Sequence, residues 1–353
     1  MIPSRRLMAI SMILAAACPA ACDEATPTAE TTMPASPAKM TTQTGSLELT
    51  DGTTTPLLTL TNGQLSVQFV PALGGKIVSI KDAAGREYLS RSDRPYAPRE
   101  YGMDFGKTEF DGIDECFPTM GACKYPFAPW EGAEMVDHGE LFATAWKVLE
   151  GPGVDMQCEG TRFGYVFRRR ATLEGRTLTL RYTATNTSDA PLHYMYLFHP
   201  LFAADAGSGL VIPDAMRIRI SYNHQNFLAE HGTIKPWGEL TDAEGQPFKN
   251  DQFRPHSERY YKYHSEKLDA AELLLRHADG AGVRMTWSKD VLPYFAVWTS
   301  EGSIGGLHHF APEPSNASVD DLAAAAEIGQ DNIIPPRGTA EWTIKMDFLP
   351  ARQ

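Results

Sequence analysis

Basic residues are scarce in this sequence. Its 353 residues include 32 Lys and Arg against 44 Asp and Glu, which gives a formal net charge of −12. An acidic surface repels the phosphate backbone of nucleic acids, and no cluster of basic residues interrupts it. The composition therefore excludes nucleic acid as a partner.

Cysteine is also scarce, and its spacing is uninformative about metals. The sequence has 5 cysteines, with no paired C-x-x-C motif and no zinc-like spacing. Neither a metal nor another cofactor is expected. Three cysteines lie in the body of the chain, Cys116, Cys123 and Cys158. In an oxidising compartment Cys116 and Cys123 are close enough in sequence to bridge, and the odd count leaves one thiol free.

Long apolar runs are absent, apart from one short run at the start. Residues 7–17 are apolar and follow Arg5 and Arg6, the pattern of an export signal. The run is too short to span a bilayer. It ends at Cys18, with Cys22 close behind, and small residues before a cysteine resemble the lipobox of bacterial lipoproteins. Residues 1–22 are predicted to be a signal peptide with lipidation at Cys18 or Cys22, or else a plain secretory signal.

A polar segment separates this signal from the rest of the chain. Residues 23–50 are rich in Thr, Ala, Pro, Ser and Glu and have no apolar period. Such a composition predicts a disordered tether, and residues 51–353 are then the folded domain. We expect a periplasmic protein that touches the membrane only through a lipid anchor. Nothing in the sequence indicates its oligomeric state.

Helical patterns are few as well. Only residues 319–327 have a helical composition, whereas alternating apolar residues recur in many short segments such as 65–70 and 76–81. Short strands separated by Gly, Asp, Asn and Pro turns predict an all-β fold, a large antiparallel sandwich. The segments 90–137 and 223–267 are predicted to be long loops, which often carry function on a β scaffold.

A carboxylate enclosed by prolines is the first candidate for chemistry. Glu313 lies between Pro312 and Pro314, just after His308 and His309. Because proline fixes its own φ and restricts the residue before it, the Glu313 backbone is held extended and the side chain could act as an aimed general base. The alternative is an ordinary surface loop with a solvated glutamate.

Two histidines provide further candidates. His199 precedes Pro200 at the end of a predicted strand, and His138 follows Asp137 before a glycine. Imidazole is suited to proton transfer near neutral pH. The alternative for His199 is a packed histidine bonded to a backbone carbonyl.

Carboxylates and aromatic residues lie close to His138 in the sequence. Asp114 and Glu115 are upstream, and an aromatic segment at residues 125–130 lies between them and His138. Sugars are bound by such sets, because charged groups bond hydroxyls and rings pack on C–H faces. The alternative is a solvated acidic loop.

These motifs, in this order, resemble the aldose 1-epimerase (galactose mutarotase-like) superfamily. The matching segments are residues 137–141, 198–200 and 312–315, and the last turn and strand at 333–344 are similar too. The resemblance covers roughly residues 57–349 and implies a β-supersandwich with a sugar in an open cleft. It also implies anomer interconversion without a metal, through opening of the sugar ring.

The resemblance assigns roles residue by residue. It implies that Glu313 is the base that takes the proton of the anomeric hydroxyl, and that His199 is the acid that protonates the ring oxygen. His138 contacts sugar oxygens, and the further binding candidates are Glu115, Asp114, Trp298 and His309. The family's arginine has no clear match; Arg94, Arg99 or Lys107 could replace it, and its additional aspartate could be Asp251.

Two other functions remain open. The same cleft could bind a carbohydrate without turnover, or the sandwich could be a non-catalytic partner in an envelope assembly.

Overall fold

The computed structural model describes residues 39–212, 216–242, 244–248 and 253–352. Over these residues the protein is built from β-strands, with one short α-helix, α1 (Leu322–Glu327). The all-β prediction is confirmed, and so is the helix expected near residues 319–327. No helix in this part of the chain is long and apolar enough to cross a membrane.

A large antiparallel sheet carries the residues of interest. Within the described residues it has 12 strands, in the order β1-β2-β3-β4-β5-β13-β22-β21-β18-β16-β17, with β14 also paired to β22. Their bounds are β1 (Thr41–Glu48), β2 (Thr54–Thr61), β3 (Leu65–Val70), β4 (Lys76–Asp82), β5 (Ile113–Cys116), β13 (Leu197–Pro200), β14 (Phe202–Ala203), β16 (Arg217–Asn223), β17 (Ile234–Pro236), β18 (Tyr260–Ser265), β21 (Tyr294–Ile304) and β22 (Leu307–Ser315).

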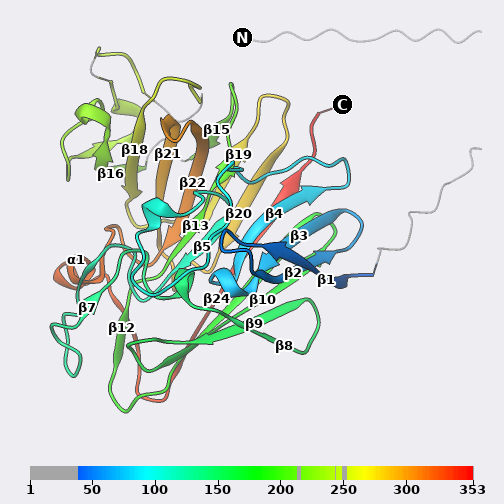
Figure 1. Ribbon diagram of the computed structural model, residues 1–353. Helices are drawn as coiled ribbons and strands as arrows, with labels where there is room; N and C mark the ends of the chain where they lie inside the picture. Colours follow the sequence, from blue (N-terminus) through cyan, green and yellow to red (C-terminus); the bar gives the residue numbers. More distant parts are fainter. Residues whose placement is uncertain (1–38, 213–215, 243, 249–252, 353) are drawn as a thin grey trace, which may run out of the picture. The chain divides into compact units, whose positions relative to one another are not determined.

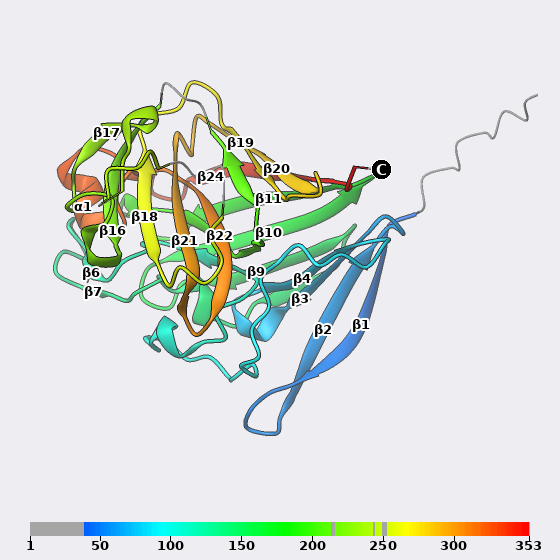
Figure 2. The ribbon, with the colours of Figure 1, turned by 90° about the horizontal axis from the view of Figure 1, so that it is seen from above.

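A second sheet has 8 strands in the same part of the chain, in the order β15-β19-β20-β24-β11-β10-β9-β8. These are β8 (Lys147–Leu149), β9 (Val154–Glu159), β10 (Tyr165–Glu174), β11 (Thr177–Asn186), β15 (Gly209–Val211), β19 (Glu272–Arg276), β20 (Gly282–Trp287) and β24 (Thr339–Leu349). Two small ribbons pair β6 (Cys123–Lys124) with β7 (Glu134–Met135) and β12 (Leu192–Tyr194) with β23 (Asn332–Ile334). Figures 1 and 2 show the two large sheets.

Short 3-10 helices lie in the connections. They are η1 (Pro71–Leu73), η2 (Phe105–Lys107), η3 (Leu141–Ala143), η4 (His224–Asn226) and η5 (Trp237–Glu239). The segments predicted as long loops, residues 90–137 and 223–267, also contain the short strands β5, β6, β7, β17 and β18. Those two predictions are therefore only partly right.

The core lies where the sheets face each other. Along β10 and β11, buried residues alternate with half-buried ones, as the period of a strand requires. Buried aromatic rings from several strands meet there: Tyr182 stacks on Trp342 at 5.4 Å between centroids, and Trp342 also contacts Tyr196 at 4.7 Å. Packing of this kind fixes the two sheets against each other.

The predicted domain boundary at residue 51 is wrong. Strand β1 falls inside the expected tether and pairs with β2 along its whole length, from Thr41↔Thr61 to Glu48↔Thr54. Nearly all of β1 is exposed on both faces, so it lacks the apolar alternation that marks a half-buried strand. Its threonines still favour extended backbone. The predicted signal, with Cys18 and Cys22, and the start of the tether lie outside the described residues.

The possible disulfide is absent. Cys116, Cys123 and Cys158 are all free thiols.

Candidate active site

Strand register brings the candidate acid and base together. Glu313 lies inside β22, so the expected loop at this position is wrong. Leu197 of β13 pairs with Ser315 of β22, and an antiparallel register then sets His199 opposite Glu313. Because side chains alternate, both point to the same face of the large sheet.

The two prolines of this strand fit its position. Pro312 and Pro314 are two residues apart, so both lack a donor toward the same neighbouring strand. β22 pairs continuously with β21 from Tyr294↔Ser315 to Glu301↔His308, whereas it pairs with β13 at a single position. A strand that forms few hydrogen bonds to one of its neighbours can accept prolines. The predicted extended backbone at Glu313 is confirmed, held by the sheet as well as by the prolines.

The acid–base pair is close and dry. Nε2 of His199 lies 3.4 Å from Oε1 of Glu313, and their side chains are 2% and 0% exposed. Burial raises the pKa of Glu313 to about 7, with Lys262 opposing the shift. Burial also lowers the pKa of His199 well below its usual value. Near neutral pH the imidazole is therefore neutral, and the carboxyl group titrates.

A lysine that the sequence did not point to completes this cluster. Nζ of Lys262, on β18, lies 2.8 Å from Oε2 of Glu313 and 2.7 Å from Oδ1 of Asp320. His264 Nε2 lies 3.2 Å from the same Asp320 oxygen. Burial alone would lower the pKa of Lys262, but Asp320 and Glu313 outweigh it and raise that pKa well above its usual value. Lys262 is a fixed buried cation.

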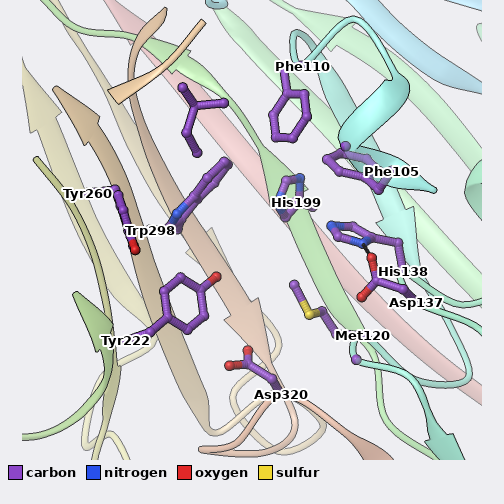
Figure 3. Close-up of a pocket in the computed structure, with 13 residues that line it drawn as sticks. Phe105, Phe110, Met120, Asp137, His138, His199, Tyr222, Tyr260, Trp298 and Asp320 are labelled. Carbon is purple, nitrogen blue, oxygen red and sulfur yellow. Dashed lines mark hydrogen bonds and ion pairs between the residues drawn. The ribbon is translucent and has the colours of Figure 1, made fainter. Parts of the chain in front are cut away.

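A pocket of about 450 Å³ opens beside this cluster. Figure 3 shows aromatic side chains around it, with His199 and His138 on one wall and Asp320 at its lower edge. The residues that line it are Phe105, Gly106, Phe110, Met120, Gly121, Asp137, His138, His199, Tyr222, Tyr260, Trp298, Ile304 and Asp320. This volume is within the range of small-molecule sites.

His138 lies on one side of His199, and β22, the strand that carries Glu313, lies on the other side. Its ring stacks on Phe105 at 3.7 Å between centroids, and its Nδ1 lies 2.7 Å from Oδ2 of Asp137. The carboxylate contact orients the ring and leaves Nε2 for a ligand. The rings of His138 and His199 are 5.2 Å apart, so both imidazoles reach the same small volume.

Solved structures share this architecture. A candidate aldose 1-epimerase from Klebsiella pneumoniae aligns with a TM-score of 0.64 and 11% identity, over 88% of this chain and 84% of its own. A galactose mutarotase related enzyme from Lactobacillus acidophilus gives 0.59 and 14%, over 88% and 99%. A galactose mutarotase-like protein from Clostridium acetobutylicum gives 0.57 and 13%, over 90% and 99%. The chain has the galactose mutarotase-like fold. No family model and no curated protein matches it.

The mutarotase-like fold brings four of the predicted residues to one site. His199, His138 and Trp298 line the pocket, Glu313 contacts His199, and the ring centroids of Trp298 and His199 are 5.8 Å apart. Glu313 itself is fully buried and is connected to the pocket through its contact with His199. Figure 3 shows Trp298 facing His199 across the pocket.

Glu115 and Asp114 are not brought to the pocket, which corrects the expectation that they bind a ligand there. As neighbours in β5 they point to opposite faces of the sheet. Glu115 lies in the core between the sheets, where it accepts hydrogen bonds from Arg169, Tyr182 and Tyr196 at 2.7, 2.9 and 2.6 Å. Asp114 is on the pocket face, but it is buried beneath the pocket and occupied by Lys76 and Arg99.

His309 is likewise behind the pocket wall, so the expectation that it binds a ligand is also corrected. It is fully buried, 4.6 Å from the ring of Trp298, and burial lowers its pKa to about 3. A neutral imidazole in this place supports the indole that lines the pocket. His308, next to it, faces His256 on the other side of β22.

None of the basic residues proposed for the missing arginine reaches into the pocket. Arg99 is buried against Glu109 and Asp114, and Arg94 donates to the carbonyls of Gly106 and Thr108. Lys107 is not among the lining residues. Asp251 lies outside the described residues. Within the described residues, no group of three or more His, Cys, Asp or Glu side chains is arranged to hold a metal ion.

Proposed function

We propose that this protein is an aldose 1-epimerase-like isomerase that interconverts the anomers of a sugar. The observation that carries the proposal is the contact of Glu313 with His199, 3.4 Å apart, beside a pocket walled by aromatic rings. The mutarotases among the structural neighbours share only the fold with this chain, so the chemistry is argued from its own residues.

The reaction needs one proton removed and one delivered at two oxygens of the same carbon. Glu313 takes the proton of the anomeric hydroxyl, while His199 gives a proton to the ring oxygen. The bond between the anomeric carbon and the ring oxygen then breaks, and an open-chain aldehyde forms. After rotation of the aldehyde, the same steps run in reverse and close the ring on its other face.

The protonation states of the free site fit this scheme. Burial raises the pKa of Glu313 to about 7 and lowers that of His199, so below about pH 7 the pair is a carboxylic acid beside a neutral imidazole. The reactive form is a carboxylate beside an imidazolium, which holds the same single proton. One transfer between Oε1 and Nε2 reaches it, without uptake from solvent.

The walls of the pocket supply binding. Trp298, Phe105 and Phe110 offer rings for the C–H faces of a sugar, and His138 offers a ring nitrogen to its hydroxyls. Asp137 and Asp320 are the carboxylates in the lining, so the pocket disfavours anionic groups. The proposed ligand is a small sugar without a phosphate or carboxylate.

The test is anomer exchange measured by NMR on a panel of aldoses. The wild-type protein should accelerate exchange of at least one sugar, and Glu313→Gln should reduce that rate by about 10²–10⁴-fold, as expected for loss of a general base. Glu341→Gln, which changes an exposed glutamate of β24, is the matched control and should retain the rate. Spontaneous exchange with wild type, or full activity in Glu313→Gln, would contradict the proposal.

A second function has one observation in its favour. Lys262 holds the far oxygen of Glu313 at 2.8 Å, and such an ion pair could keep the carboxylate as a fixed ligand for a hydroxyl. The protein would then bind a carbohydrate without turnover. Calorimetry would give saturable sugar binding for this function while anomer exchange stayed at its spontaneous rate.

The location of the protein is a further proposal. We propose export to the periplasm with a lipid anchor at Cys18 or Cys22, on the sequence pattern described above. Metabolic labelling with a palmitate analogue tests it: single Cys18→Ser and Cys22→Ser variants should separate the modified cysteine from the unmodified one. A plain secretory signal would give no label in the wild type.

A further inference from the structure

We infer that Asp320 and Lys262 form a positioning pair that controls when Glu313 can accept a proton. The inference rests on the proposed function and assigns regulation of its base to residues behind and beside the pocket. Neither residue gives a proton to the sugar oxygens or takes one from them in the proposed reaction.

The three groups form a chain from the pocket into the protein. Asp320 lines the pocket and keeps 23% of its side chain exposed, whereas Lys262 and Glu313 are 0% exposed. Lys262 lies between them, 2.7 Å from Oδ1 of Asp320 and 2.8 Å from Oε2 of Glu313. The outer carboxylate is thus linked to the base through a single ammonium group.

Local structure explains why these groups meet. Lys262 pairs with Trp298 on β21, so its side chain shares the pocket face of the large sheet with that indole. Asp320 precedes α1, and Ser221 Oγ donates to its Oδ2 at 3.2 Å. On β16 the register shifts between Ile220 and Asn223, and this irregularity brings Ser221 toward the cluster.

Other charged and titratable groups also face this cluster, from every strand packed against it. They are His199 on β13, Asp114 and Cys116 on β5, His264 on β18, Tyr222 on β16, His309 on β22, and Asp137 and His138 on the loop after β7. Lys262 is the cation among them that touches Glu313.

One cation shared by two carboxylates gives Glu313 an intermediate basicity. Without Lys262, burial would make the Glu313 carboxylate less favourable, so the transfer of its proton to His199 would be harder. Without Asp320, Lys262 would favour the carboxylate more strongly, so Glu313 would lose the proton that it exchanges with His199 at a lower pH. Burial raises the pKa of Glu313 to about 7 against the attraction of Lys262, and the negative charge of Asp320 adds to the rise.

The main test measures the titration of the Glu313 carboxyl by ¹³C NMR in the protein without sugar, with Glu313→Gln to assign the signal. Asp320→Asn leaves Lys262 entirely to Glu313 and should shift the Glu313 midpoint down by about one pH unit. Lys262→Met removes the cation and should shift the midpoint up by at least about one pH unit. Lys124→Met is the control: it removes a lysine from the exposed ion pair with Glu134 and should leave the Glu313 midpoint unchanged.

If Lys262→Met does not fold, Asp320→Asn still tests the inference, because asparagine is nearly isosteric with aspartate and the ion pair between Lys262 and Glu313 is retained. An unmoved Glu313 midpoint in Asp320→Asn overturns the inference, even if the protein is an active isomerase. Shifted midpoints in a protein that does not accelerate anomer exchange would support the inference and contradict the proposed function. The alkaline limb of kcat/KM should follow the NMR midpoint in each active variant, which a merely structural role would not produce.

Discussion

Two buried lysines of the large sheet each pair with one glutamate and one aspartate, but the carboxyl groups around them titrate differently. Lys76 on β4 lies 3.0 Å from Glu109 and 2.6 Å from Asp114, and Lys262 on β18 lies 2.8 Å from Glu313 and 2.7 Å from Asp320. Around Lys76 a second cation, Arg99, binds both carboxylates. Around Lys262 no second permanent cation does so among the described residues.

The charge count explains the difference in titration. Although burial alone would raise them, Lys76 and Arg99 hold the pKa values of Glu109 and Asp114 below their usual values. Burial raises the pKa of Glu313 to about 7, because its one cation, Lys262, only partly opposes the effect and the Asp320 carboxylate adds to it. Glu109 and Asp114 are thus kept ionised by Lys76 and Arg99, whereas Glu313 in the Lys262 cluster can gain or lose a proton.

The largest expected effect comes from breaking the Lys76 cluster. Asp114→Asn leaves two buried cations with one fewer carboxylate and should lower the free energy of unfolding by about 3–5 kcal/mol, the cost of a broken buried ion pair. Denaturant unfolding measures it. Glu313→Gln, the matched change in the other cluster, should cost clearly less, because its carboxyl is already half protonated near pH 7. Equal costs would mean that the two clusters do not differ in this way.

The same comparison separates what the sequence could predict from what it could not. Glu313, His199 and His138 were found because prolines, a glycine and strand ends mark them locally. Lys262 and Asp320 join the site only through the register of β18 with β21 and the loop before α1. A lysine in a strand carries no local sign that it faces inward.

Strand alternation explains the main errors. Asp114 and Glu115 are adjacent in the sequence and were assigned to one site, but a strand sends neighbouring side chains to opposite faces. Glu115 therefore enters the core, and Asp114 is taken by the Lys76 cluster. The fold itself was predictable, because alternating segments with turn residues recur along the whole domain. Strand β1 was missed because it buries neither face.

An effect of intermediate size sharpens the comparison through pH. The Glu313–His199 pair must hold one proton to react, and the raised pKa of Glu313, about 7, is where this proton is lost as pH increases. We therefore expect kcat/KM to fall about tenfold per pH unit above pH 7, since the doubly deprotonated pair has no acid. Below pH 7 the rate should stay level until His199 takes a second proton, at a pH well below its usual pKa. A rate that rises with pH through 7 would assign Glu313 a simple base role with the acid elsewhere.

The smallest expected effect concerns the carboxylate left over in the Lys76 cluster. Asp111 lies 3.8 Å from Lys76, and burial raises its pKa, as it does for Glu313. Its partner, however, is the Tyr96 hydroxyl, which donates at 2.9 Å, and it has neither an imidazole nor the pocket beside it. Asp111→Asn should change the free energy of unfolding by less than about 1 kcal/mol, because burial disfavours the charge of Asp111 and the amide keeps a hydrogen-bond acceptor for Tyr96. Anomer exchange should also be unchanged.

A large loss of stability would show that Asp111 is ionised and needed by Lys76, and a loss of activity would connect the two clusters. Unchanged stability and activity in this variant would mean that a buried carboxyl group with a raised pKa acts in catalysis only where an imidazole and a pocket lie beside it.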